Sequence, residues 1–172
     1  LAQFAGNDKP FNNLKNICEW AKSLGYKAVQ IPSWDSRLID IIKAGESKTY
    51  CDEIKGIVNN AGLEISELST HLQGQLVASH NAYDKMFDAF APNNLHGNVK
   101  GRTEWAVKQV KAAANASYNL GINVMASFSG SFIFHTIYPW PQRPKGLVET
   151  AFKELAKRWI PILNHCKDKG VE

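Results

Sequence analysis

The chain has 172 residues, 44% of them hydrophobic and 21% charged, a composition typical of a soluble globular domain and unlike a disordered or fibrous chain. The formal net charge of +4 comes from Lys and Arg residues scattered along the sequence, so it indicates a solvated surface and no nucleic-acid partner. No apolar run approaches the roughly 18 to 20 residues of a membrane helix, and the three cysteines lack the spacing of a disulfide framework. We therefore expect a cytoplasmic protein without a membrane segment.

Amphipathic helices and apolar strands alternate along the chain. In chain order we expect a strand tail at 1–5, a helix at 14–21, a strand at 28–31, a helix at 50–58, a strand at 63–69, a helix at 105–114, a strand at 122–128, a helix at 147–163 and the start of a strand at 171. Four helices end at a glycine that suits the left-handed conformation after a helix: Gly25, Gly62, Gly121 and Gly170. Because each strand is followed by a helix, the strands are predicted to be parallel with right-handed crossovers.

The predicted connections differ in length at the two ends of the strands. Those from helix to strand are short, whereas those from strand to helix run over residues 32–46, 71–100 and 129–146. In α/β folds, long loops after the strands build the active site at the carboxyl ends of the sheet. No glycine-rich dinucleotide or phosphate-binding motif follows any strand, which excludes the usual nucleotide-binding interpretations.

Candidate ligand-binding side chains follow the first two of these strands. Gln30 and Trp34 lie at the end of strand 28–31, where Trp34 is suited to cover the apolar face of a sugar or, equally, to pack the loop onto the rim. His71 and Gln73 follow strand 63–69. Imidazole and amide groups suit hydrogen bonds to hydroxyls, and an imidazole is able to move a proton near neutral pH. A lone histidine is also a common structural group, so the structural interpretation of His71 stays open.

The strand predicted at 122–128 ends in small polar residues, and a stiff aromatic loop follows it. Ser127 stands where a ligand approaches the backbone closely, and Trp140 lies among the aromatic and proline residues of 132–144. Such a loop is typical of a wall over a pocket or of a subunit interface. No cluster of Asp, Glu, His or Cys has metal-ligand spacing. The residues alone predict a pocket for a hydroxyl-rich ligand and leave the reaction type undetermined.

Three segments together carry a family resemblance: VQIPSWD (29–35), ELSTHLQGQ (67–75) and YPWPQRP (138–144). With them the sequence resembles the bacterial sugar phosphate isomerase/epimerase proteins of the xylose-isomerase-like barrel superfamily. The resemblance implies a (β/α)₈ TIM barrel, of which this chain holds about the first four βα units and the start of strand five. Residues 1–172 are then a single domain segment, the N-terminal half of the barrel, and we expect the chain to continue at both ends.

The resemblance also implies an activity. Its members isomerise or epimerise a sugar or sugar phosphate by proton transfer through an enediolate-like intermediate, with a divalent ion, Mn²⁺, Mg²⁺ or Co²⁺. The implied metal ligands lie after Glu172, so no metal ligand is assigned within the chain. His71 matches a strand-end histidine that contacts sugar, which makes it the implied catalytic residue. DNA-repair endonuclease members carry a histidine at the end of strand four, where this chain has Ser127, and this difference argues against a nucleic-acid substrate.

Two other functions remain open at this point. A non-catalytic sugar-binding or assembly module would keep the pocket without the metal ligands, and a dehydratase acting on a cyclic polyol would use the same barrel. In each case the partner is a small sugar or polyol. Half a barrel leaves open strand edges, so aggregation or pairing with a second copy of the chain is also expected.

Overall fold

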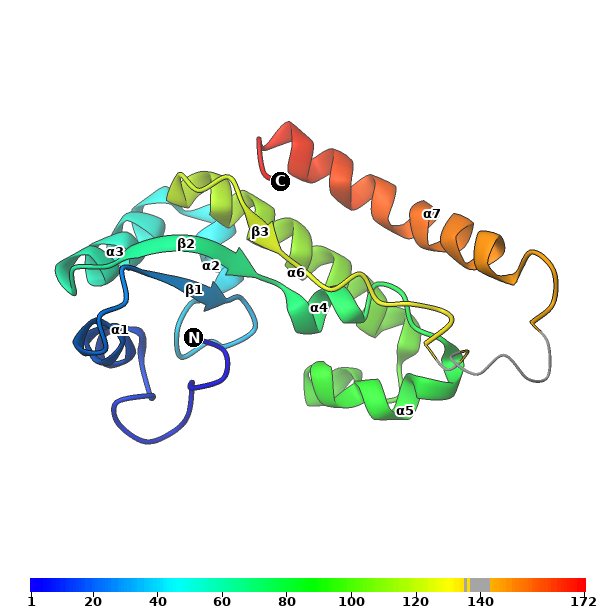
Figure 1. Cartoon of the computed structure of the whole chain (residues 1–172), viewed down its shortest axis with the longest axis horizontal. Helices are drawn as coiled ribbons and strands as arrows, with labels where there is room; N and C mark the ends of the chain where they lie inside the picture. The colour runs from blue at the N-terminus through cyan, green and yellow to red at the C-terminus, as the bar shows by residue number, and fades with distance from the viewer. Residues whose placement is uncertain (135, 137–142) are drawn as a thin grey trace.

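A short parallel sheet forms the centre of the molecule, whose computed structural model describes residues 1–134, 136 and 143–172. β1 (Ala28–Pro32) pairs with β2 (Glu64–Ser69), and β2 pairs with β3 (Met125–Ala126), in the order β1-β2-β3. Helical segments connect each strand to the next (Figure 1). This arrangement confirms the predicted α/β fold with parallel strands.

Helices fill more of the chain than the sequence indicates. In chain order they are α1 (Leu14–Ser23), α2 (Ile41–Glu46), α3 (Lys48–Asn60), α4 (His71–Gln75), η1 (Asn81–Tyr83), α5 (Asp84–Phe87), η2 (Asp88–Phe90), η3 (Asn93–Leu95), α6 (Val99–Leu120) and α7 (Leu147–Asp168). The connection after β2, predicted as a loop, is thus largely helical. Side-chain caps occur at two helix starts, where His80 Nδ1 accepts from the Ala82 N–H at η1 and Asn98 Oδ1 accepts from the Gly101 N–H at α6. In the described part of the chain, no helix has the length and apolar character to cross a membrane.

The four predicted helix-to-strand joints are confirmed. Each joint glycine has a positive φ, as at Gly121, where φ is 73° and the N–H donates to the Tyr118 carbonyl. A residue with a Cβ adopts this conformation only at a cost. The joints therefore return the chain to the sheet within a few residues and leave the longer segments at the other end of the strands.

The core lies between the sheet and the helices packed on one face of it. Val29, Ile31 and Leu68 from the strands pack with apolar residues of α1, α2, α3 and α6, and a second cluster joins α6 to α7. The three cysteines are free and buried, and burial raises the pKa of Cys18 to about 11. A thiol in such surroundings packs as a small apolar side chain.

The predicted strand tail at residues 1–5 is wrong. Residues 2–4 form a turn, and only the Leu1 amino group reaches β1, where it donates to the Gln30 carbonyl at 2.9 Å. Phe4 packs instead against Trp20 of α1, with ring centroids 4.8 Å apart, which draws this segment away from the sheet. The strand predicted at 122–128 is also shorter, since only Met125–Ala126 is a strand.

The strand predicted to start at residue 171 is not formed, but the end of the chain makes backbone hydrogen bonds beside β3. The Glu172 N–H donates to the Asn123 carbonyl at 2.8 Å, and the Met125 N–H donates to the Glu172 carbonyl at 2.9 Å. The chain after Gly170 therefore runs beside β3, as the next strand of a barrel does.

A bulge between β1 and β2 sets which side chains face away from the helices. Val29 pairs with Ile65, but Gln30 pairs with Glu67, so one extra residue of β2 stands between these pairs. Because side chains alternate along a strand, Gln30 and Glu67 lie opposite the core residues Ile31 and Leu68. We call this second side of the sheet the open face. In a closed barrel it is the interior.

Candidate functional site

Three aromatic rings from consecutive strand ends meet at the carboxyl edge of the sheet. Trp34 follows β1, His71 follows β2 and Phe128 follows β3. The His71 ring stacks on Phe128, with centroids 4.4 Å and planes 21° apart, and the Trp34 ring lies 5.9 Å from His71. Stacking covers one face of the imidazole and leaves its two nitrogens at the ring edge. We call these three residues the aromatic cluster.

The position of His71 follows from how β2 ends. The next residue, Thr70, donates its N–H to the Ala126 carbonyl of β3 at 2.8 Å, and its hydroxyl donates to the same carbonyl at 3.4 Å. α4 begins immediately afterwards, so His71 is its first residue. The imidazole is thereby held over the ends of β2 and β3. Sequence reasoning singled out Trp34 and His71 but missed Phe128, whose signal was an aromatic residue at the end of a predicted strand.

A polar pair lies on the open face below the strand ends. Gln30 donates from Nε2 to Glu67 Oε1 at 2.6 Å, and both side chains are partly buried. The bond fixes the Gln30 amide, and its carbonyl oxygen remains an acceptor. Sequence reasoning missed Glu67, although a carboxylate in the middle of a predicted apolar strand was a visible signal of a polar interior.

Of the other predicted site residues, Gln73 and Ser127 are not part of the aromatic cluster. The Gln73 side chain is fully buried, and its Oε1 accepts from the Ser33 hydroxyl at 3.3 Å. Ser127 is partly buried and donates to the Phe128 carbonyl at 3.1 Å. Trp140 lies outside the described residues.

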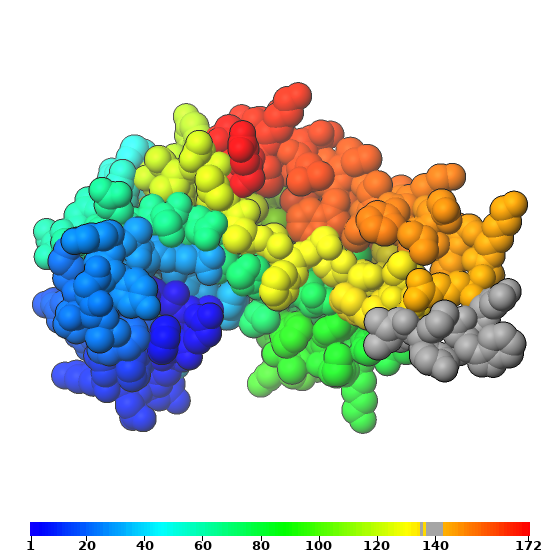
Figure 2. Space-filling model, viewed as in Figure 1, coloured from blue at the N-terminus to red at the C-terminus, as the bar shows by residue number. Residues whose placement is uncertain are grey.

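The molecule is hollowed beside the strand ends. Figure 2 shows this hollow between the N-terminal residues, in dark blue, and the short helices after β2, in green. Trp34 lines an open pocket of about 520 Å³, together with residues of the N-terminal turn and with Asp35 and Arg37. The Arg37 guanidinium donates to both Asp35 oxygens, at 2.8 and 2.6 Å, and to Asn7 Oδ1 at 2.8 Å. These bonds join the loop after β1 to the N-terminal turn.

The stability that the Arg37–Asp35 ion pair gives to this pocket wall depends on pH. Hydrogen bonding from Arg37 lowers the pKa of Asp35 below its usual value. The ion pair therefore contributes stability above about pH 4, the range where an unfolded-state aspartate is ionised, and that contribution is lost as the pH falls through the lower folded-state pKa. We expect Asp35→Asn to lower the melting temperature at pH 6 and to have a smaller effect at pH 3.

Thermal denaturation at the two pH values measures this difference. Asp8→Asn is the matched control, because Asp8 is an exposed aspartate of the same N-terminal region. A deficit of Asp35→Asn that stays the same from pH 6 to pH 3 would contradict the assigned ion pair.

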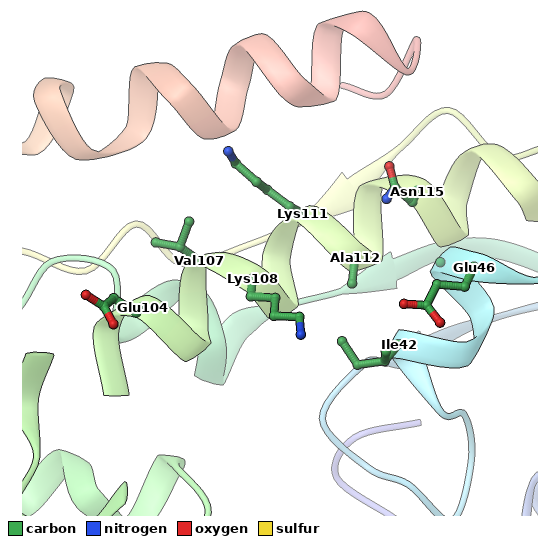
Figure 3. A pocket seen from close by; sticks show the side chains of 9 residues that line it. Ile42, Glu46, Glu104, Val107, Lys108, Lys111, Ala112 and Asn115 are labelled. Carbon is green, nitrogen blue, oxygen red and sulfur yellow. The ribbon is translucent and has the colours of Figure 1, made fainter. Parts of the chain in front are cut away.

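A second concave surface lies on the helix side of the molecule. This groove of about 390 Å³ runs between α2 and α6 and is lined by Ile42, Glu46, Val107, Lys108 and Lys111, among others (Figure 3). Its lysines and glutamates are surface residues of two helices, and no strand end contributes to it. The groove is therefore separate from the aromatic cluster.

Metal-binding side chains do not gather within the described residues. No three or more His, Cys, Asp or Glu side chains there are placed to hold one ion. Glu67 contributes one carboxylate to the open face, and one of its oxygens accepts from Gln30. Structural and catalytic divalent ions take about four to eight ligands. The described residues therefore do not make a complete divalent-ion site.

A parallel α/β sheet with its candidate site at the carboxyl strand ends is an arrangement shared by barrel and open-sheet α/β proteins. A family model described as xylose isomerase-like TIM barrel matches residues 18–172, and the chain belongs to this family. No curated protein matches the chain.

Two solved structures are similar in fold. A xylose isomerase domain protein from Planctomyces limnophilus is 14% identical, with a TM-score of 0.54 over 90% of this chain and 46% of its own. A D-psicose 3-epimerase from Clostridium cellulolyticum H10, solved with D-tagatose, is 10% identical, with a TM-score of 0.48 over 91% of this chain and 44% of its own. The chain thus spans less than half the length of these structures, and the first likeness supports a partial barrel.

Proposed function

We propose that this chain forms the substrate-binding part of a metal-dependent sugar isomerase or epimerase. The observation that carries the proposal is the aromatic cluster, in which Trp34, His71 and Phe128 come together from three successive strand ends. Family membership supports the reaction class. The described residues do not complete a divalent-ion site, so the proposal places the ligands of the ion outside them.

Each residue has a distinct role in this proposal. The Trp34 ring covers the apolar face of the sugar, because the C–H groups of a sugar pack well on an aromatic face. A nitrogen at the edge of the His71 ring contacts a sugar hydroxyl and transfers a proton during enediolate formation. The Gln30 amide, fixed by Glu67, accepts a hydrogen bond from a second hydroxyl deeper in the barrel.

The charges beside Trp34 favour an unphosphorylated sugar. Among the described residues, Arg37 is the cation that lines the pocket of Trp34, and its guanidinium is already bound to both oxygens of Asp35. A phosphate at this wall would have to displace the Asp35 carboxylate. The bidentate hydrogen bonding between Arg37 and Asp35 is among the stronger side-chain interactions.

Turnover in the presence of Mn²⁺ tests the proposal. The complete enzyme, including the ligands of the ion, is incubated with D-xylose, D-fructose or D-tagatose in D₂O, and products are separated by chromatography. We expect an isomer or epimer that carries deuterium at the carbon next to the carbonyl, because an enediolate exchanges its proton with solvent. His71→Ala and Trp34→Ala are each expected to lower kcat/KM at least about tenfold, which corresponds to about 1.4 kcal/mol.

His165→Ala is the matched histidine control. His165 lies on α7, where its Nε2 is 2.9 Å from Asn115 Oδ1 on the helix side, so kcat/KM should be unchanged. Sugar binding without any product would favour the non-catalytic binding module instead. A dehydrated product from a cyclic polyol would favour the dehydratase. Full activity of His71→Ala would remove His71 from the reaction.

A further inference from the structure

Gln73 has a polar side chain with no solvent-exposed surface, two residues after His71. Its Oε1 accepts from Ser33, while neither its Nε2 nor the nearby buried Ser69 hydroxyl has a partner among the described residues. Buried amides are normally held by hydrogen bonds, and this one contacts the end of β1. A side chain enclosed in this way does not reach a ligand in the hollow, so any contribution of Gln73 to the site is indirect.

Thr70 and Gln73 have the spacing of a capping box, in which each side chain would bind the backbone of the other residue. The structure uses them differently. The Thr70 hydroxyl donates to the Ala126 carbonyl of β3, and Gln73 Oε1 accepts from Ser33 at the end of β1. The first turn of α4 is therefore attached to the strands on both sides of β2 rather than to itself.

Ser33 makes this attachment relevant to the aromatic cluster. Its N–H donates to the Ser69 carbonyl at 2.9 Å, and its hydroxyl donates to Gln73, so Ser33 is bound to both β2 and α4. The next residue in the chain is Trp34. The bond between Ser33 and Gln73 thus links the segment that carries Trp34 to the helix that carries His71.

We propose that Gln73 is a positioning residue, which acts through Ser33 to set the place of the Trp34 ring relative to the His71 ring. The amide at a strand end predicted a direct sugar contact for Gln73, and the buried geometry assigns it this other role. This proposal rests on the proposed function, because the relative position of the two rings matters for a sugar bound between them. Its test needs no sugar, so a failure to find turnover would bear on the proposed function and leave this proposal to its own measurement.

The test follows the His71 ring by NMR in the full chain. Proton–carbon correlation spectra record the Cε1–Hε1 groups of the five histidines, and His71→Gln identifies the His71 peak by its loss. Ring currents of Trp34 and Phe128 shift this peak and fall steeply with distance. We expect Gln73→Met and Ser33→Ala each to move the peak, and the double variant to move it no further than the larger single change, because both break one bond.

Gln75→Met is the matched control, since Gln75 is a partly buried glutamine on the same short helix. Its His71 peak should stay at the wild-type position. Melting temperatures are recorded for every variant. A Gln73→Met protein that melts earlier but keeps the wild-type His71 peak would show a merely structural role and overturn the proposal. If Gln73→Met does not fold, an unmoved peak in Ser33→Ala overturns it equally.

Discussion

Replacing Gly74 with alanine should destabilise the protein by about 2 to 3 kcal/mol, the range of forced overpacking in a close-packed region. Gly74 lies in α4, and a Cβ at this position would overlap the Phe128 carbonyl oxygen and the Ser127 hydroxyl. The helix cannot move away without displacing His71, because Thr70 fixes its start to β3. The same substitution should therefore disturb the stacking of His71 on Phe128.

Gly56→Ala provides the control for this substitution. Gly56 lies in α3, and nothing stands within 4 Å of an added Cβ there. Alanine in such a position should be neutral or should stabilise the helix by up to about 1 kcal/mol. Urea denaturation of the two variants gives the comparison. Equal midpoints for Gly74→Ala and Gly56→Ala would mean that α4 is not seated against the end of β3.

Arg102→Met should cost about 3 kcal/mol of unfolding free energy, because it removes a buried charge from its partners and leaves two carboxylates without a cation. Arg102 is fully buried on α6. Its guanidinium donates to Asp88 Oδ1 at 2.7 Å and lies 3.2 Å from Asp84 Oδ1. These contacts hold the short helices after β2, which form one side of the hollow in Figure 2.

Lys100→Met is the control for the loss of a cation on the same helix. Lys100 pairs with Glu104 at 3.8 Å, and both side chains are largely exposed, so the change should stay within about 0.5 kcal/mol. Hydrogen exchange of residues 84–95 should rise in Arg102→Met and remain unchanged in Lys100→Met. The assigned role of Arg102 fails if both variants unfold at the same urea concentration.

The sequence predicted the helix ends and the parallel strands, because these features depend on nearby residues. Glycine at a helix end has a conformational reason that depends on no distant residue, and the joints at Gly25 and Gly62 are confirmed. Parallel strands followed from the alternation of strand and helix. The meeting of Trp34 with His71 followed in turn, because the carboxyl ends of parallel strands share one edge of the sheet.

The features that the sequence did not predict depend on packing between residues that are distant in the chain. The residues at 1–5 look like a strand, but the contact of Phe4 with Trp20 is not visible in the local pattern. Gln73 looks like a ligand-binding amide until the structure shows Ser33 beside it, 40 residues away in the sequence. Glu67 was overlooked because its partner Gln30 belongs to another strand.

The bulge in β2 gives this strand one residue more than β1 without changing which side chains face the helices. Ile65 and Leu68 both pack toward the helices although they are three residues apart, a separation that a regular strand would place on opposite sides. The extra residue absorbs this difference. Deleting Ser66 would leave Ile65 and Leu68 two residues apart, so a regular strand would still place both toward the helices and Glu67 on the open face. Relatives that lack this extra residue should therefore keep the same side chains toward the core.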